Sequence, residues 1–446
     1  MRTLPGIPAA PGALPVLGHA LQLIRDPLGL MKDLPNYGDL VQIKVGRSTV
    51  LVVCDPELTR QVFLDDRIYD KGGPLYDRVR EVLGNGLATC PYTDHRRQRR
   101  LIQPAFHRAR IEAYAGAMSQ QIDDVVSAWG DDGTVEVLAE TTTIAARTLV
   151  ATLFATAPPE LADSLLKGWA DINAGLYRRM LMPAALRALP TLGNHRYGKS
   201  IKRFRAAVEQ TATDYRAAGC DHGDLLSTLM APPNGDDEPL SDIEVRDQIA
   251  SFLLAGIETT ASAIAWSLFL VAHHPEVEQK LHTEVDTVLH GKAATFQDLP
   301  RLELTRNIVN EALRLHTPPW MGSRITQYPT RLGRFSIPSD TAILFSTYIM
   351  HRLPQAYLHA ERFDPDRWRN NQAKALPRGS YIPFGAGARK CPGDLFSLTE
   401  TTLALATITA RWKMEPVTPS SVPNVPRAVW GPQGLRMQTK ARYPGR

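Results

Sequence analysis

The feature that most constrains the fold is one long apolar stretch between Ser241 and Pro275. Ser241 followed by Glu244 three residues later is the pattern of a capping box, which predicts that a helix begins here. The apolar pattern continues to His274, so about 31 residues at 1.5 Å each give a helix of roughly 46 Å. Because apolar side chains surround it on nearly all sides, we expect a central, buried helix over residues 241–274.

The middle of this helix has a composition that burial alone does not explain. Residues 255–260 read Ala-Gly-Ile-Glu-Thr-Thr, which places a glycine, a carboxylate and two β-branched alcohols in a buried helix, where each is costly. These costly choices mark residues 255–260 as a candidate functional segment. The structural alternative is that Thr259 only bonds the carbonyl four residues earlier, and Thr260 is expected to do no more than that.

The rest of the chain predicts a mainly α protein with small β-sheets, forming a single domain over residues 1–446. The helix-like periodicity, strand-like alternation and Pro/Gly punctuation leave no linker long enough to separate domains. The expected elements are a Pro/Gly-rich arm at 1–18, a β-hairpin at 40–54, helices near 95–107, 109–128, 135–155, 160–180 and 198–217, short strands within 322–350, and a last helix after Cys391.

Composition and charge exclude several classes of protein. The net charge of +5 comes from basic and acidic residues that are mostly mixed, so generic nucleic-acid binding is not supported. No stretch has the ~18 consecutive apolar residues of a transmembrane anchor, and early prolines interrupt any signal peptide, so we expect a soluble cytoplasmic protein. Wide spacing of the cysteines excludes a disulfide framework or zinc ribbon and fits a reducing compartment. They are Cys54, Cys90, Cys220 and Cys391.

One cysteine stands in a distinctive loop over residues 384–393, which reads Phe-Gly-Ala-Gly-Ala-Arg-Lys-Cys-Pro-Gly. The two glycines allow the backbone to approach a flat group closely. Pro392 suits the first position of a helix, which would place Cys391 at a helix N-terminus, where the dipole and the cations before it favour a thiolate. A single thiolate suits a soft metal with one protein ligand. The alternative is a buried structural cysteine in a glycine turn.

These residues carry a resemblance to the cytochrome P-450 monooxygenases. Residues 384–393 match the family signature F-G-x-G-x-R-x-C-x-G at every fixed position, and 255–260 match A-G-x-D/E-T-T. Residues 311–314 match E-x-x-R, and 363–368 match F-x-P-x-R-F/W; Arg362 mimics the last motif two registers early and is not assigned to it. The resemblance implies a triangular α-rich domain in which the long helix crosses over haem.

The resemblance implies a cofactor, haem b, and the residues that bind it. Cys391 is then the metal ligand. Arg389, His95, Arg99 and Arg324 match positions that contact the haem propionates, although many relatives have Trp where His95 stands. For each of the three arginines, the alternative is an ordinary surface arginine.

The resemblance also separates catalytic residues from structural ones. Glu258 and Thr259 match the acid–alcohol pair that delivers protons during O2 activation. The resemblance therefore implies a helix that opens at Gly256, with water held beside Glu258 and Thr259 for proton transfer. Glu311, Arg314 and Arg367 match a structural cluster in which one carboxylate lies between two guanidinium groups and locks the cysteine loop.

The electron donor is expected to be a separate protein. The sequence ends soon after Cys391, so we expect no fused reductase and assign the supply to a ferredoxin and a ferredoxin reductase, with the chain itself a monomer. Arg96, Arg97 and Arg100 alternate with the haem-contacting positions, so they are expected to form a basic face that attracts an acidic ferredoxin. A merely solvated helix face is the alternative.

The resemblance also implies which positions line the substrate pocket, and the residues found there are apolar. Its residues carry no charge, which favours a hydrocarbon-like substrate such as a terpenoid, and the chain further resembles actinobacterial sesquiterpene oxidases of secondary metabolism and antibiotic biosynthesis. Two other functions stay open: a haem-thiolate peroxygenase or rearrangement enzyme, which needs no proton relay, and a non-catalytic haem sensor. Core packing is the alternative for each pocket residue. The residues are Phe252, Ala255, Pro318, Trp320, Met321, Val429 and Trp430.

Overall fold

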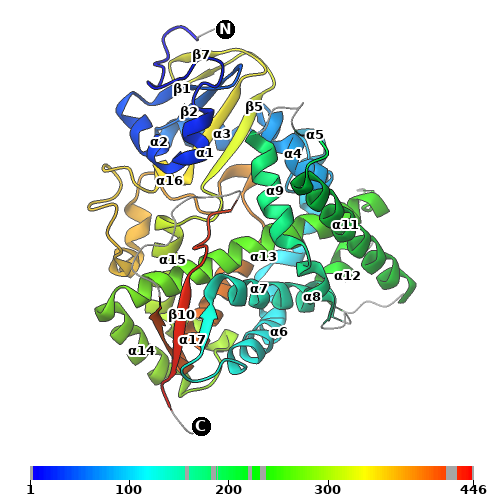
Figure 1. The fold of residues 1–446 in the computed structure, drawn as a ribbon, viewed down its shortest axis with the longest axis vertical. Helices are drawn as coiled ribbons and strands as arrows, with labels where there is room; N and C mark the ends of the chain where they lie inside the picture. Colours follow the sequence, from blue (N-terminus) through cyan, green and yellow to red (C-terminus); the bar gives the residue numbers. More distant parts are fainter. Residues whose placement is uncertain are drawn as a thin grey trace.

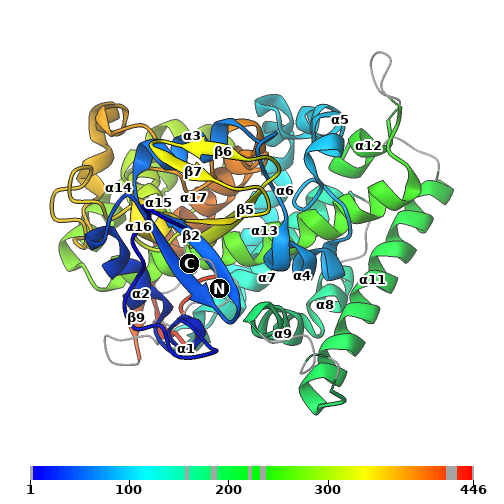
Figure 2. The ribbon, with the colours of Figure 1, turned by 90° about the horizontal axis from the view of Figure 1, so that it is seen from above.

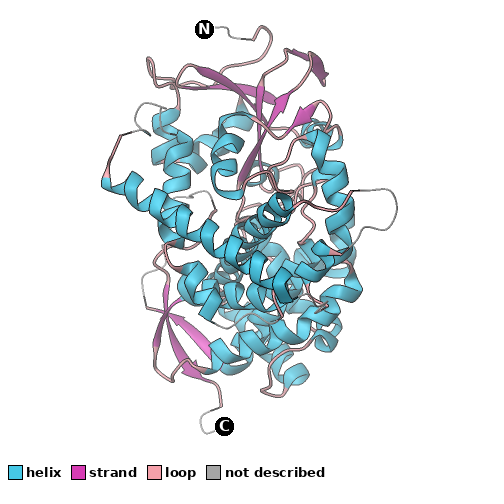
Figure 3. Ribbon diagram, turned by 90° about the vertical axis from the view of Figure 1, so that its right-hand side faces the viewer, coloured by secondary structure: helices cyan, strands magenta, loops and turns pink. Residues whose placement is uncertain are grey.

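The computed structural model describes residues 4–155, 160–181, 187, 189–218, 223–231, 238–417 and 429–443. Helices form most of the molecule (Figure 1). The strands gather at two opposite ends, with the helices between them (Figure 3). The prediction of a mainly α fold with small sheets is therefore confirmed.

The larger sheet lies at the N-terminal end and has the strand order β1-β2-β8-β5-β3. β1 and β2 form an antiparallel hairpin whose turn contains Gly46 at φ +58°, a left-handed conformation that suits glycine. β2 pairs in parallel with β8, which pairs antiparallel with β5. The strands are β1 (Leu40–Val45), β2 (Ser48–Val53), β3 (Tyr69–Asp70), β5 (Met321–Thr326) and β8 (Ala342–Ser346).

The N-terminal arm is bonded to this sheet. The Ala10 N–H donates to the carbonyl of Gln42 (2.9 Å), and the Gln42 side chain donates to the carbonyl of Ile7 (2.6 Å). A Cβ on Gly18 would lie 2.4 Å from the carbonyl oxygen of Lys44, so only glycine allows this approach. The arm therefore follows the edge of β1.

The other strands form two smaller sheets, and the helices fill the space between the ends. A three-stranded sheet has the order β4-β10-β9, and β6 pairs with β7. These strands are β4 (Thr134–Glu136), β6 (Thr330–Leu332), β7 (Phe335–Ile337), β9 (Trp412–Pro416) and β10 (Arg436–Ala441). The α-helices are α1 (Ala20–Arg25), α2 (Pro27–Asp33), α3 (Pro56–Leu64), α4 (Gly73–Leu83), α5 (Tyr92–Ile102), α6 (Arg108–Ser127), α7 (Val137–Leu153), α8 (Glu160–Leu166), α9 (Trp169–Leu181), α11 (Leu192–Ala218), α12 (Leu225–Met230), α13 (Asp242–Ala272), α14 (Pro275–Leu289), α15 (Glu303–Leu315), α16 (Thr347–Met350) and α17 (Asp394–Arg411).

The long helix α13 crosses the centre of the fold, as Figure 1 shows. Ser241 and Glu244 form both bonds of the predicted capping box. The expectation that the helix opens at Gly256 is wrong: α13 is continuous there, and a Cβ on Gly256 would lie 2.8 Å from Leu149 of α7. The glycine instead lets two helices pack closely. Of the described helices, α13 alone has the length and apolar composition to cross a bilayer, but 72% of its most apolar window is buried, as in a core helix.

The helix expected over residues 160–180 is two helices. α8 and α9 are separated near Gly168, which has φ +87°. A Cβ on Gly168 would lie 2.6 Å from the Ser200 hydroxyl of α11. A left-handed residue in close contact with a second helix ends α8 and turns the chain into α9.

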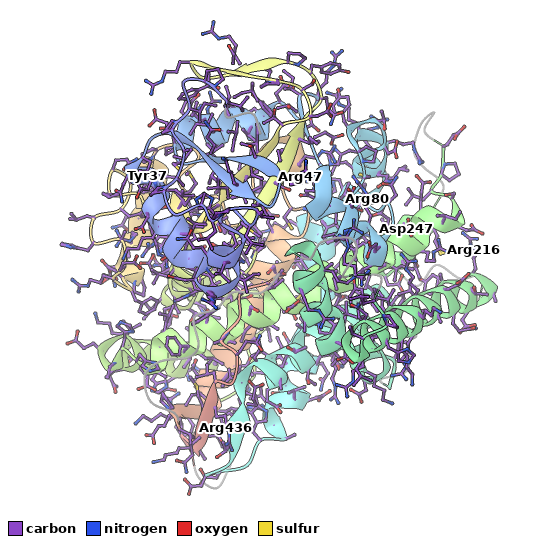
Figure 4. The ribbon with its side chains drawn as sticks, turned by 45° about the horizontal axis from the view of Figure 1, so that its top comes forward. Tyr37, Arg47, Arg80, Arg216, Asp247 and Arg436 are labelled. Atoms are coloured by element: carbon purple, nitrogen blue, oxygen red, sulfur yellow. The ribbon has the colours of Figure 1, made fainter. Side chains whose placement is uncertain are left out.

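The end of α4 packs on α13. The Asn85 N–H, just after α4, donates to the Asp247 carboxylate (2.7 Å). A Cβ on Gly86 would lie 2.5 Å from the backbone oxygen of Asp247, so this contact also requires glycine. Figure 4 labels Arg80 of α4 and Asp247 of α13 at this junction. The contact fixes the segment between α4 and α5 against the central helix.

Candidate active site

The cysteine loop is closed by its own backbone. The Cys391 N–H donates to the carbonyl of Phe384 (2.9 Å), and Gly385 and Gly387 have φ of +70° and +67°. A Cβ on Gly387 would lie 2.1 Å from the carbonyl oxygen of Phe63 in α3. The two glycines therefore supply left-handed turns, and the second permits close contact with α3.

Cys391 is exposed, whereas the other two cysteines of the described residues are buried. The last helix begins at Asp394, so the expectation that Cys391 directly starts a helix is wrong: Pro392 and Gly393 form a turn between them. The thiol still lies deep enough that burial raises its pKa, while the Gly393 N–H and the cations Arg99 and Lys71 act in the opposite direction. Hydrogen bonding and nearby cations, rather than a first helical turn, thus support the thiolate.

Five basic residues gather near this loop, and we call them the cation cluster: Lys71, His95, Arg99, Arg324 and Arg389. Burial and the charges of Arg389, Lys71, Arg99 and Arg324, in that order of size, together lower the pKa of His95 to about 3. All four cations therefore lie close enough to His95 to act on its pKa. The four residues assigned to the propionates are therefore brought together, with Lys71 among them.

His95 has an unmet bonding capacity. The residue is 2% exposed, and its Nδ1 atom is buried with no hydrogen-bond partner among the described residues. The Oδ2 atom of Asp66 lies 3.9 Å from it, which is beyond hydrogen-bond distance. Since buried polar atoms are nearly always bonded, this atom points to a missing partner.

Arg99 and Arg324 reach the site from different elements. Arg99, on α5, donates from Nη1 to the carbonyl of Lys390 (2.5 Å), the residue before the cysteine. Arg324, on β5, is 4% exposed and donates to the Tyr76 hydroxyl (3.2 Å). Its guanidinium lies over the ring of Phe345, 5.2 Å from the centroid. Helix and sheet thus each contribute a positioned cation.

Arg389 is fully buried and already has strong partners. It donates from Nε to Asp66 (3.1 Å), from Nη2 to Asp70 (2.7 Å) and from Nη1 to the carbonyl of Cys90 (2.9 Å). Both carboxylates therefore pair with Arg389, and among the described residues no carboxylate forms a salt bridge with Lys71, Arg99 or Arg324. Buried charge of one sign is costly unless an opposite charge binds it.

Lys71 was not predicted from the sequence. Its ammonium donates to the carbonyls of Ala88 (2.8 Å) and Leu87 (3.3 Å). Burial, followed by the charges of Arg324 and Arg389, lowers its pKa to about 7. Nothing in its local sequence distinguishes it from a surface lysine, since its position depends on β3 pairing with β5.

These residues fit haem, the group that the resemblance implies. The thiolate of Cys391 would be a ligand for iron, and cations without a carboxylate partner suit the two propionate carboxylates. The orphaned Nδ1 of His95 can bond such a carboxylate. In that arrangement Cys391 would hold the iron. The propionates would be bound by His95, Arg99, Arg324 and Lys71. Arg389 is instead bonded to Asp66 and Asp70.

The middle of α13 presents an uncovered face. Ala255 is exposed although its helix crosses the molecule, and Thr259 and Glu258 are half-buried. The Thr259 hydroxyl donates to the carbonyl of Ala255 (2.5 Å), which is the structural alternative considered for it. Thr260 does not behave as expected, because its hydroxyl lies 3.1 Å from that of Ser397 and links α13 to α17.

Glu311, Arg314 and Arg367 lie together, and we call them the sealed cluster. Glu311 is completely buried and accepts from Arg314 (2.7 and 2.9 Å) and Arg367 (3.4 Å). Trp368 adds an indole N–H bond to the same carboxylate (2.9 Å). Arg362 offers only its backbone carbonyl, to Arg314 (3.1 Å). Arg367, and not Arg362, is therefore the arginine whose side chain bonds Glu311.

His351 connects the sealed cluster to the cysteine loop and was also missed. Its Nε2 accepts from the N–H of Ile382 (2.9 Å), two residues before the loop, and its Nδ1 lies 3.1 Å from the carbonyl of Arg314. Burial lowers the pKa of His351 to about 3, with the charges of Arg314 and Arg352 acting in the same direction. An isolated histidine beside a turn gave no sequence signal.

The residues assigned to the pocket fall into separate groups. Trp320 and Trp430 are each 1% exposed and pack in a core cluster with Trp266. Phe252 lies edge-on to Phe106, with ring centroids 5.5 Å apart. Ala255 is exposed on α13, Pro318 is buried and accepts from the Trp430 N–H (2.8 Å), and Met321 and Val429 are half-buried.

The basic face expected on α5 is only partly available. Arg97 donates to the carbonyl of Glu238 (3.0 Å) and pairs with Glu244 of the capping box. Arg96 and Arg100 are exposed. Arg97 therefore anchors the start of α13, and the charge offered to solvent comes from the other two.

Comparison with known proteins agrees with this geometry. A cytochrome P-450 family model matches residues 8–440. Pentalenene oxygenase of Streptomyces avermitilis is 43% identical over 438 residues, which cover 98% of this chain and 98% of that protein. Cyclooctat-9-en-7-ol 5-monooxygenase of Streptomyces melanosporofaciens is 43% identical over 413 residues, or 92% of this chain and 89% of that protein. The crystal structure of the cytochrome P450DA haem domain has a TM-score of 0.89 at 26% identity, with 99% of both chains covered.

The fold and site thus define a haem-binding oxidoreductase of the monooxygenase class. The chain belongs to the cytochrome P-450 family. When bound, thiolate-ligated haem supplies the activation of O2 from which one oxygen atom is inserted into a substrate.

Proposed function

We propose that this monooxygenase oxidises an apolar terpenoid, such as a sesquiterpene hydrocarbon, by inserting oxygen at an unactivated C–H bond. The supporting observation is the identity of 43% over nearly the whole chain to two enzymes whose names describe terpenoid oxygenation. The uncovered α13 face agrees with it, because Ala255 offers only a methyl group beside Thr259. Such a face can orient a hydrocarbon only by shape.

Thr259 and Glu258 are the proposed proton-handling residues. The Thr259 hydroxyl is bonded to the Ala255 carbonyl, so it can accept a hydrogen bond from water while its own proton stays on the helix. Glu258 is adjacent in sequence and half-buried, which places a carboxylate on the same turn. Together they would hold a proton near the reacting oxygen while the apolar face keeps bulk water out.

Electrons are proposed to come from a ferredoxin and its reductase, in a soluble, cytoplasmic system with the enzyme as a monomer. Arg96 and Arg100 are exposed on α5, whose His95 and Arg99 lie in the cation cluster. A donor bound at this helix would therefore sit next to the residues that hold haem. An acidic surface on the donor would be steered there.

The proposal is tested by substrate binding and product analysis. The purified holoenzyme is titrated with cyclic sesquiterpene and diterpene hydrocarbons, fatty acids and steroids, and the Soret band is monitored for displacement of the iron-bound solvent. We expect terpenes alone to shift the band and to give oxygenated products with a surrogate ferredoxin, reductase, NADPH and O2. A fatty acid or steroid that binds tighter and is turned over faster would reject the terpenoid assignment.

A further inference from the structure

A second concentration of charge lies away from the active site. From residue 172 to residue 208 the sequence has no Asp or Glu, although the whole chain has 46 acidic residues against 51 basic ones. The stretch contributes α9 and the first half of α11, which lie beside each other near α4 (Figures 1 and 2). Its cations are Arg178, Arg179, Arg187, Arg196, Lys199, Lys202, Arg203 and Arg205.

Half of these cations line one pocket of about 650 Å³. Arg179, Arg187, Lys202 and Arg205 form its wall together with His195, and Glu81 is the single acidic residue among the lining side chains. Because four permanent cations face one carboxylate, the pocket favours an anion. No residue of the active site described above takes part in it.

The opposite lip of the pocket is apolar. Leu189, Pro190 and Leu192 line it between α9 and α11. Leu189 is 48% exposed and Leu192 is 81% exposed, which is unusual for large aliphatic side chains. A ligand with both a charged group and a hydrocarbon part would contact both sides.

The floor of the pocket is preformed and contains unmet bonding capacity. A Cβ on Gly175 would lie 2.2 Å from the ring of Tyr197, so only glycine in α9 allows this close contact. Tyr197 is 4% exposed, and its hydroxyl is buried with no hydrogen-bond partner among the described residues. The Arg179 guanidinium lies over the same ring, 5.0 Å from its centroid, and its Nε is likewise buried and unbonded, 3.7 Å from the Glu81 carboxylate.

We propose that this pocket binds the phosphate or diphosphate group of an amphiphilic ester, with the hydrocarbon part against the leucine lip. Guanidinium groups match phosphate oxygens with paired N–H donors, and lysine adds a point charge. The buried Tyr197 hydroxyl and Arg179 Nε gain the partners that they lack. The ester has two sources, a soluble alkyl or prenyl diphosphate and the headgroup of an anionic phospholipid.

The first experiment compares two lysines of the same helix. Lys202 lines the pocket and Lys199 does not, and both are exposed on α11, so Lys202→Glu and Lys199→Glu change the net charge equally. Inorganic pyrophosphate is titrated into each holoenzyme by calorimetry at about 0.15 M salt, where diffuse attraction is screened beyond roughly 8 Å. We expect Lys202→Glu to weaken binding at least about tenfold and Lys199→Glu to change it less than about twofold. Equal losses in both variants, or no binding by the unmodified enzyme, would overturn the proposal.

Two further variants test the rest of the assignment. Tyr197→Phe removes only the buried hydroxyl and should weaken pyrophosphate binding several-fold; unchanged binding would remove Tyr197 from the site. Leu192→Ser should weaken a short prenyl diphosphate but leave pyrophosphate unaffected, and a failure to separate the two ligands would reject the amphiphile. An intact reduced CO spectrum in each variant shows that the fold and the haem site are preserved.

The two sources are separated with vesicles. If the ligand is a phospholipid, the holoenzyme should sediment with phosphatidylglycerol vesicles, and Lys202→Glu and Leu192→Ser should each reduce the bound fraction. If the ligand is a soluble ester, the prenyl diphosphate should bind with the same dependence on Lys202, while sedimentation with vesicles stays at the level of neutral phosphatidylcholine.

Discussion

The molecule contains two buried ionic clusters that differ in how completely they are satisfied. In the sealed cluster, the Glu311 carboxylate accepts from two arginines and an indole, and Arg314 donates its remaining N–H groups to backbone carbonyls. In the cation cluster, an imidazole nitrogen of His95 is unbonded and positive charge exceeds negative charge. A complete cluster is what a structural role requires, and an incomplete one is what a binding site leaves for its ligand.

The largest expected effect comes from Cys391, which lies in the loop beside the cation cluster. Cys391→Ala should abolish the red-shifted absorption of the reduced CO complex and all monooxygenase activity, since no other described cysteine is exposed. Cys54→Ala is the matched control, because that thiol is buried among β-sheet residues and should leave the spectrum intact. Survival of the spectrum in Cys391→Ala would show that the ligand has been assigned wrongly.

The sealed cluster should respond in stability rather than in ligand binding. Glu311→Gln keeps the shape but leaves two buried guanidinium groups without a counter-charge, so we expect a loss of about 3–5 kcal/mol in the free energy of unfolding, with or without haem. Denaturant unfolding of both forms measures it. Glu361→Gln breaks a pair in which the glutamate is 61% exposed and should cost less than about 1 kcal/mol. Equal costs at the two sites would remove the distinction between sealed and surface pairs.

His351, which contacts the sealed cluster, should make the free energy of unfolding depend on pH. Its folded pKa of about 3 lies below the ordinary value of 6.5, so the unfolded chain binds the proton first. The stabilisation is complete above about pH 6.5 and is lost as the pH falls towards 3, by about 1.4 kcal/mol per unit. The contribution of His351 is the difference in the free energy of unfolding between wild type and His351→Gln, measured at pH 7.5, 6.5 and 5.5. A difference between the two that does not shrink on acidification would contradict it.

A substitution in the cation cluster should weaken haem binding rather than the stability of the fold. Lys71→Met removes a buried ammonium that forms no salt bridge with a carboxylate among the described residues and whose charged form is disfavoured by burial, so the apoprotein should be as stable as wild type or more so. Haem should be lost at least about tenfold faster to an acceptor such as apomyoglobin, because one propionate loses a charged partner. Lys71→Arg should retain most of the affinity, and Lys413→Met, on the surface beside Glu415, is the control for charge. A destabilised apoprotein with unchanged haem retention would place Lys71 among the structural residues.

The same comparison explains how far the sequence could be interpreted. The contacts among Glu311, Arg314 and Arg367 could be predicted because all three residues lie in short motifs that match the family. Cys391 was assigned in the same way, and its role as iron ligand stays a prediction. Lys71 and His351 were missed because strand pairing and packing bring them to their sites from distant segments, and a single sequence contains no record of such pairing.

Local sequence patterns predicted where α13 begins but not why it contains Gly256. The capping box located the start of α13 correctly, since its two bonds join residues three apart. The role of Gly256 was misjudged because the reason for a glycine there is Leu149, a side chain on another helix. Composition shows that a small residue is needed, but only the packed structure shows which neighbour needs the space.

The smallest expected effect concerns Thr259, where the structure shows a helix bond and the proposed function needs a relay. Thr259→Ala and Thr259→Val both remove the hydroxyl, so substrate binding should persist while a several-fold larger share of NADPH consumption yields hydrogen peroxide. Thr259→Ser keeps the hydroxyl and should keep the coupling. Thr260→Val breaks the contact with Ser397 and should lower stability by about 1 kcal/mol without altering the product-to-NADPH ratio. If all four variants couple as well as wild type, the bond to Ala255 is the whole role of Thr259, and the proton must reach the site through other groups.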